Sequence, residues 1–151
     1  MDKKQALIKA MALCARKENS ESDIRGKLKI WEIEQDDTDW VVAELVKQKF
    51  VDDLRYAIAY VRDKVRFNQW GRIKIRYMLS AGKISPSIIE QAFEHIDEDS
   101  YADTLKLLLQ KKSREMKRET NPYAKKQKLV KFAQGRGFEI DLVLRELQEL
   151  M

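Results

Sequence analysis

The sequence predicts an all-α fold. Apolar residues recur at helical spacing along almost the whole chain, and sequence signals for helix N-termini precede most of these apolar runs. Only five glycines and two prolines occur among 151 residues, so few positions interrupt a helix. Charged residues make up 36% and hydrophobic residues 44% of the chain, a composition typical of helices with wide solvated faces. We therefore expect about nine helices.

Three long segments have apolar residues at helical spacing, and two of them follow the full i, i+3, i+4 and i+7 pattern. The stripes are formed by Leu7, Ala10, Met11 and Cys14; by Leu54, Ala57, Ile58, Val61 and Val65; and by Leu105, Leu108 and Leu109 in a segment that begins near Tyr101. Two shorter helical segments follow each long one. The shorter segments are expected around Ile24–Trp31, Trp40–Val46, Ile73–Leu79, Ile88–Ile96, Lys125–Phe132 and Leu142–Leu150.

Capping residues support the predicted helix starts. Ser20 is a good N-cap, with Asp23 at the position from which an acid reaches back to the cap. Thr38 is expected to cap the third helix. Asp52 is expected to cap the fourth, where Asp53 complements the positive end of the helix dipole.

Proline and glycine mark further boundaries. Ser85-Pro86 and Asn121-Pro122 each place a capping side chain directly before a proline at the first helical position, where the missing N–H costs nothing. Gly82 is expected to end one helix, and Gly135 or Gly137 another.

The helices fall into three groups that align with one another. Leu28, Leu79 and Phe132 are the expected equivalent anchors of the middle helices. The first copy fits less well, because its turn at residues 32–39 looks longer and acidic. We predict three-helix repeats at residues 1–50, 51–97 and 98–151, which stabilise one another by stacking. A single nine-helix domain with accidental periodicity is the alternative.

The net charge of +5 is unevenly distributed. Residues 62–83 have a net charge of +6 and residues 106–131 of +8, which leaves −9 on the rest of the chain. Clustered positive charge suggests a polyanion or an acidic protein as partner. The alternative is two solvated helix faces.

With this layout the chain resembles the RecX family of bacterial regulators, from about Ser20 to Leu150. The residues that carry the resemblance are Phe50, Asp52, Asp53, Arg55, Tyr56 and Ala57; Gly71, Ile75, Leu79, Gly82 and Ile84; residues 22–28; and Arg136, Gly137 and Phe138. Two features depart from the family pattern. The first repeat has Trp31 and Glu32 where a glycine turn is usual, and the third repeat has a longer, very basic first helix, Lys106–Arg118.

The resemblance implies an elongated, curved array of three-helix units that modulates the RecA recombinase without being an enzyme. Such a protein lies in the groove of the RecA filament on single-stranded DNA and suppresses ATP hydrolysis, strand exchange and co-protease activity. It thereby regulates homologous recombination, DNA repair and the SOS response. The implied partners are RecA and single-stranded DNA, with double-stranded DNA as a further candidate.

The family motif itself is best explained structurally. Asp52 and Asp53 serve a helix start, and Arg55 is expected to pair with an acid in the same turn. Gly71 begins a middle helix, where a side chain would strike the preceding helix. Trp70 is expected to be a packing residue, with base stacking as the alternative.

The candidate contact residues for RecA or DNA are therefore basic. On helices, Arg62 with Arg66 and Arg72 with Arg76 stand at i and i+4 and form one positive patch together with Lys74. In the second basic block, the segment Lys111–Arg118 has no continuous apolar stripe and is expected to extend beyond the core as an arm, with a solvated, partly frayed helix as the alternative. The basic residues after Pro122 are expected to continue its surface. The candidate residues of this second block are Lys111, Lys112, Arg114, Lys117, Arg118, Lys125, Lys126 and Lys128. A general DNA-binding module without RecA specificity is the main alternative function, and a DNA enzyme is a second.

No catalytic, cofactor or metal site is predicted. His95 ends an apolar helix, Cys14 lies on an apolar stripe, and no phosphate-binding or dinucleotide loop occurs. The cluster at Asp36, Asp37 and Asp39 is interpreted as an acidic helix start rather than a magnesium site. A single cysteine and the absence of a long apolar run predict a cytoplasmic protein without a membrane segment. The sequence leaves the oligomeric state open, and a monomer is the default expectation.

Overall fold

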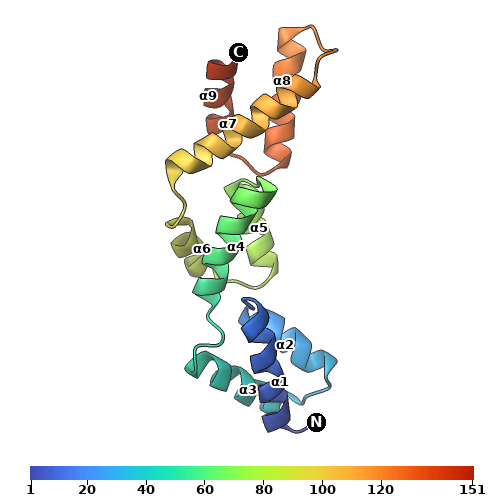
Figure 1. The fold of residues 1–151 in the computed structure, drawn as a ribbon, viewed down its shortest axis with the longest axis vertical. Helices are drawn as coiled ribbons and strands as arrows, with labels where there is room; N and C mark the ends of the chain where they lie inside the picture. The colour runs from blue at the N-terminus through green and yellow to red at the C-terminus, as the bar shows by residue number, and fades with distance from the viewer. The chain divides into compact units, whose positions relative to one another are not determined.

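The computed structural model describes residues 1–151 and confirms the all-α prediction, with nine helices and no strand (Figure 1). The helices are α1 (Lys3–Arg16), α2 (Glu21–Ile30), α3 (Gln35–Lys47), α4 (Asp53–Asn68), α5 (Arg72–Ala81), α6 (Pro86–Phe93), α7 (Glu98–Glu115), α8 (Pro122–Gly135) and α9 (Ile140–Leu150). Contacts group the chain into two units: residues 1–60 with 79–92, and residues 61–78 with 93–151. The repeat boundaries and the curvature of the array stay predictions.

The core of the first unit lies between α1, α2 and α3. Helix α3 packs against both α1 and α2. The fully buried side chains at the centre are Ala6, Ala10, Ile24, Leu28, Val41, Val42, Leu45 and Val51. Two of them are alanines on α1, so this helix approaches its neighbours closely.

The core of the second unit lies between α7, α8 and α9, which all pack on one another. It contains Leu105, Leu108 and Leu109 of α7, as the apolar stripe predicts. Tyr101 packs on Phe138 at the end of this core, with ring centroids 5.3 Å apart.

The same turn closes the middle helix of each repeat. Glu32, Lys83 and Gly137 take the left-handed conformation, with φ of 60°, 65° and 94°. The next residue in each case donates its N–H back into the helix: Ile33 to Leu28, Ile84 to Leu79 and Phe138 to Ala133, at 3.0, 3.0 and 3.1 Å. This is the bonding of a Schellman motif, which satisfies carbonyls at a helix end.

The turns correct the predicted alignment in the third repeat. The residue equivalent to Leu28 and Leu79 is Ala133, which is fully buried, and not Phe132, which is only half-buried. Helix α8 has 14 residues, whereas α2 and α5 have 10. The spacing between equivalent residues of successive repeats is therefore not constant. The apolar pattern alone did not reveal this one-residue shift.

The first repeat also follows the common pattern more closely than predicted. Its turn is not longer than the others, and Glu32 makes it without a glycine. Likewise Lys83, and not Gly82, takes the left-handed conformation in the second repeat. Thr38 does not cap α3, which begins at Gln35; it is a buried residue within the helix, at the position that Val143 occupies in α9.

The other predicted caps are confirmed. Ser20 and Asp23 form a reciprocal capping box. The Asp52 carboxylate accepts the Arg55 N–H at 3.0 Å. Ser85 accepts the Ile88 N–H at 3.3 Å, and Asn121 accepts from two N–H groups of the first turn of α8.

Gly71 and Gly137 form a close backbone contact in the second unit. The Gly71 N–H donates to the Arg136 carbonyl at 2.8 Å, and the Ile73 N–H donates to the Gly137 carbonyl at 3.0 Å. A Cβ on Gly71 would lie 2.3 Å from the Gly137 carbonyl carbon and oxygen. The obstacle to a side chain is therefore the turn after α8, and not the preceding helix as predicted.

Replacement of Gly71 by alanine is expected to lower the free energy of unfolding by about 2 kcal/mol, because backbone atoms must move to admit the methyl group. Gly26 is the matched control: it is exposed in α2, and a Cβ there meets nothing within 4 Å. Gly26→Ala is expected to stabilise by about 0.5–1 kcal/mol through helix propensity. Urea unfolding of both variants measures the difference. Equal effects would contradict the close contact.

Candidate functional site

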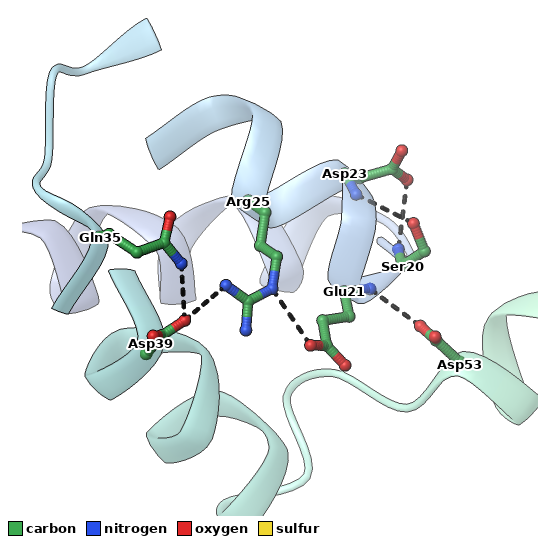
Figure 2. Close-up of polar contacts among 7 residues, drawn as sticks. All are labelled: Ser20, Glu21, Asp23, Arg25, Gln35, Asp39 and Asp53. Carbon is green, nitrogen blue, oxygen red and sulfur yellow. Dashed lines mark hydrogen bonds and ion pairs between the residues drawn. The ribbon is translucent and has the colours of Figure 1, made fainter. Parts of the chain in front are cut away.

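The N-terminus of α2 is satisfied by a side chain from the next repeat. The Glu21 N–H, which has no partner within its own helix, donates to the Asp53 carboxylate at 2.8 Å (Figure 2). Asp53 is the first residue of α4. The second acid of the family motif therefore joins α4 to α2, a role that sequence reasoning missed because the two positions are far apart in the chain.

Arg55 holds the same junction together. Its guanidinium pairs with Glu18 at 2.6 Å and donates to the carbonyls of Lys49 and Phe50 at 3.1 and 3.3 Å. The predicted partner in its own turn is thus wrong: the acid comes from the segment before α2. The hydrogen bond with Glu18 raises the pKa of Arg55.

Arg25 links α2 to α3 beside this junction. It pairs with Asp39 at 2.8 Å and with Glu21 at 3.2 Å, and Gln35 donates to the same Asp39 oxygen at 3.0 Å (Figure 2). The hydrogen bond from Arg25 lowers the pKa of Asp39. Asp39 thus serves an ion pair, while Asp36 and Asp37 lie in the first turn of α3.

A groove of about 680 Å³ lies over this junction. Both signs of charge line it, since Lys29 and Lys83 as well as Glu21 and Asp53 are among the lining residues. The lining thus contains two acids and three basic side chains, because Arg25 also belongs to it, and its charge is mixed rather than concentrated in one sign.

Arg72 lies in an ion-pair cluster of the second unit. Its guanidinium pairs with Glu98 and with Glu139, the latter at 2.6 Å, and lies over the Tyr101 ring at 4.1 Å from its centroid. The Arg72 N–H donates to the Tyr101 hydroxyl at 2.9 Å, and that hydroxyl donates to Glu139 at 2.5 Å. Burial and the Glu139 hydrogen bond raise the pKa of Tyr101.

This cluster corrects the prediction that Arg72 belongs to an available positive patch. Only 15% of its side chain is exposed, and both terminal nitrogens are bonded to carboxylates. Burial opposes the charge, but the hydrogen bonds with Glu98 and Glu139 outweigh it and raise the pKa of Arg72. Arg72 therefore links the start of α5 to the starts of α7 and α9 through these two ion pairs.

The other candidates of the first basic block lie nearer the surface. Arg62 and Arg66 are exposed on α4, and Arg76 is exposed on α5 with its guanidinium 4.9 Å from the Phe93 ring centroid. Lys74 is half-buried, with its ammonium 4.4 Å from the Trp70 ring centroid. The structure thus keeps basic side chains on consecutive helices of this unit.

The second basic block does not form the predicted arm. Helix α7 ends at Glu115, Met116 packs against the core of α7, α8 and α9, and the Lys112 ammonium lies 4.9 Å from the Phe132 ring centroid on α8. The candidates are distributed along α7, the following turn and α8: Lys111, Lys112 and Arg114; Lys117 and Arg118; and Lys125, Lys126 and Lys128. Two of them have acidic partners, since Lys128 pairs with Glu119 at 2.7 Å and Lys112 lies 3.8 Å from Glu115.

The remaining candidates give no catalytic arrangement. His95 is exposed, and burial raises the pKa of the Cys14 thiol, which disfavours the reactive thiolate. No three His, Cys, Asp or Glu side chains lie close enough to share a metal ion. None of the helices combines the length and apolar character that a membrane span requires.

Comparisons with known proteins agree with this architecture. Residues 52–92 match the family model of the second three-helix domain of RecX, and residues 98–147 match that of the third. A regulatory protein RecX of Clostridium acetobutylicum is 32% identical over 92% of this chain and 67% of its own length. One of Vibrio parahaemolyticus is 30% identical over 89% of this chain and 84% of its own length. The crystal structure of RecX from Lactobacillus salivarius superposes with a TM-score of 0.90 at 21% identity, covering 99% of this chain and 96% of that one.

Charge reversal at Arg72 and at Arg62 is expected to change the free energy of unfolding by different amounts. Arg72→Glu would place a third carboxylate beside Glu98 and Glu139, so we expect a loss of about 3 kcal/mol in the free energy of unfolding. Arg62→Glu makes the same change of charge on an exposed site and is expected to cost less than about 0.5 kcal/mol. Denaturant unfolding followed by circular dichroism measures both, and equal stabilities would show that the Arg72 cluster contributes little.

Proposed function

The chain belongs to the RecX family of regulatory proteins, which act on RecA, and from this premise we propose that it is a negative regulator that binds in the groove of the RecA–single-stranded DNA filament. In that position it suppresses ATP hydrolysis, strand exchange and co-protease activity without chemistry of its own. The observation that carries the proposal is the distribution of basic side chains over two of the three helix groups.

The charge distribution suits a partner made of DNA and protein. Exposed arginines and lysines release counterions when they meet phosphates, which favours binding to a polyanion. The same side chains pair with carboxylates on a protein surface, and arginine does so with two hydrogen bonds. Arg62, Arg66 and Arg76 in the second unit are the first candidates, with Lys111, Arg114, Lys117 and Arg118 as a second group.

A repeat array explains how binding would inhibit. Successive repeats present successive surfaces, so one molecule contacts more than one RecA subunit as well as DNA. ATP hydrolysis in a filament depends on movement between subunits, and a ligand bound to several of them resists that movement. Inhibition should therefore need fewer molecules than there are RecA subunits.

A general DNA-binding function remains the alternative, because basic helices bind duplexes without any need for RecA. Such a module would bind free DNA and the filament equally well, and its affinity would fall steeply with salt. It would reduce RecA activity only by competing for DNA.

The proposal is tested by titrating the protein into the single-stranded-DNA-dependent ATPase reaction of RecA. We expect inhibition at well below one molecule per RecA subunit, and inhibition that persists when RecA is assembled on DNA beforehand. Activity that stays unchanged at saturating protein, while the protein still binds DNA, would refute the proposal.

Charge reversal on α4 tests the surface. We expect the double variant Arg62→Glu/Arg66→Glu to raise the concentration for half-inhibition by about tenfold or more, because attractive contacts become repulsive. The control is Lys4→Glu/Lys9→Glu, which reverses two exposed charges on α1. An equal loss in both variants would point to net charge rather than to this surface.

A further inference from the structure

Aromatic and basic side chains alternate along one strip of the second unit. Trp70 lies between α4 and α5, with the Lys64 ammonium 4.9 Å and the Lys74 ammonium 4.4 Å from its ring centroid. Phe67 stands three residues after Lys64 on α4, and Tyr77 stands three residues after Lys74 on α5. Residues three apart are neighbours on a helix surface, so the strip continues from Phe67 through Trp70 to Tyr77.

The two ends of this strip are unusually exposed for aromatic residues. Phe67 is 66% and Tyr77 72% exposed, whereas Trp70 is half-buried. The core therefore does not explain the two outer rings. Arg66 adds a guanidinium 5.3 Å from the Phe67 ring centroid, and no acidic residue occurs in the sequence from Lys64 to Tyr77.

The centre of the strip is fixed by the backbone. The Trp70 N–H donates to the Lys64 carbonyl at 3.0 Å, and the adjacent Gly71 is held against the turn after α8. Trp70 thus serves as a fixed support over which both ammonium groups are placed. A site that is already ordered loses less entropy when a ligand binds.

We propose that Phe67, Tyr77 and the lysines held by Trp70 form a binding strip for single-stranded nucleic acid, in which the two exposed rings stack on bases and the ammonium groups contact phosphates. Stacking needs unpaired bases, because the faces of bases in a duplex are covered by their neighbours. The alternation of rings and cations is the pattern by which proteins hold single strands without reading their sequence. Ile73 and Met78 of α5 are also exposed, at 53% and 40%, so apolar side chains lie on the same helix as Tyr77. The affinity of alanine variants of Phe67 and Tyr77 for a single strand therefore distinguishes a nucleic-acid contact from a protein contact.

This inference deepens the proposed function by naming the residues that would contact the single strand and their mode of contact, and it relies on that function only for its biological setting. The sequence offered base stacking as an alternative role for Trp70. Here the bases stack on Phe67 and Tyr77, and Trp70 supports the lysines. The test contains no RecA, so it can fail or succeed independently of the ATPase experiment.

The experiment measures fluorescence anisotropy of a labelled oligothymidylate, an abasic oligonucleotide of the same length and a hairpin duplex. We expect the abasic strand and the duplex to bind at least tenfold more weakly than the oligothymidylate, and Phe67→Ala and Tyr77→Ala each to weaken binding of the oligothymidylate by about tenfold. Tyr77→Phe keeps the ring and is the matched control, expected to bind as the wild type does. Lys74→Gln should reduce the slope of log affinity against log salt by about 0.7, because one phosphate contact is lost.

Equal binding of the abasic strand would overturn the proposal, since it would show that phosphates alone are recognised. Unchanged affinity in both alanine variants would do the same. Circular dichroism of each variant confirms that the helices are intact.

Discussion

The structure depends on how the first backbone N–H groups of the middle helices are satisfied. A helix cannot bond these groups internally, and leaving them buried without a partner costs free energy. In α2 the Glu21 N–H is accepted by Asp53, and in α5 the Arg72 N–H is accepted by the Tyr101 hydroxyl. Both acceptors belong to the first helix of the following repeat. In α8 the first residue is Pro122, which has no N–H, and Asn121 caps the next two groups.

The need to satisfy these N–H groups explains the structural roles of several residues of the family motif. Asp53 and Arg55 join α4 to the start of α2, and Gly71 with Gly137 allows the backbone of α5 to meet the turn after α8. Arg72 neutralises two carboxylates at that second junction. These positions maintain the packing between repeats, so the proposed contacts with RecA and DNA fall on other residues. Arg62, Arg66, Phe67 and Tyr77 are exposed and take part in none of these junction contacts.

Local signals were sufficient for the helices and for most of the caps. Ser20, Asp52 and Asn121 cap groups within three residues of themselves, so their roles could be predicted from the sequence. The cluster at Arg72 could not, because its partners lie 26 and 67 residues away. The alignment of the third repeat was wrong by one residue because α8 is longer than α2 and α5, and neighbouring Phe132 and Ala133 both suit an apolar stripe. Thr38 was mistaken for a cap because threonine is common there, whereas in this fold it fills a buried position.

The most direct measurement of this account is amide hydrogen exchange at the starts of the middle helices. An N–H at the first helical position ordinarily exchanges quickly, because it lacks a partner in the helix. If side chains of the next repeat hold them, the Glu21 and Arg72 amides should exchange as slowly as amides of the core, such as those of Leu28 and Ile75. Exchange of the Glu21 and Arg72 amides at the rate of exposed groups would contradict the central claim that these bonds join the repeats.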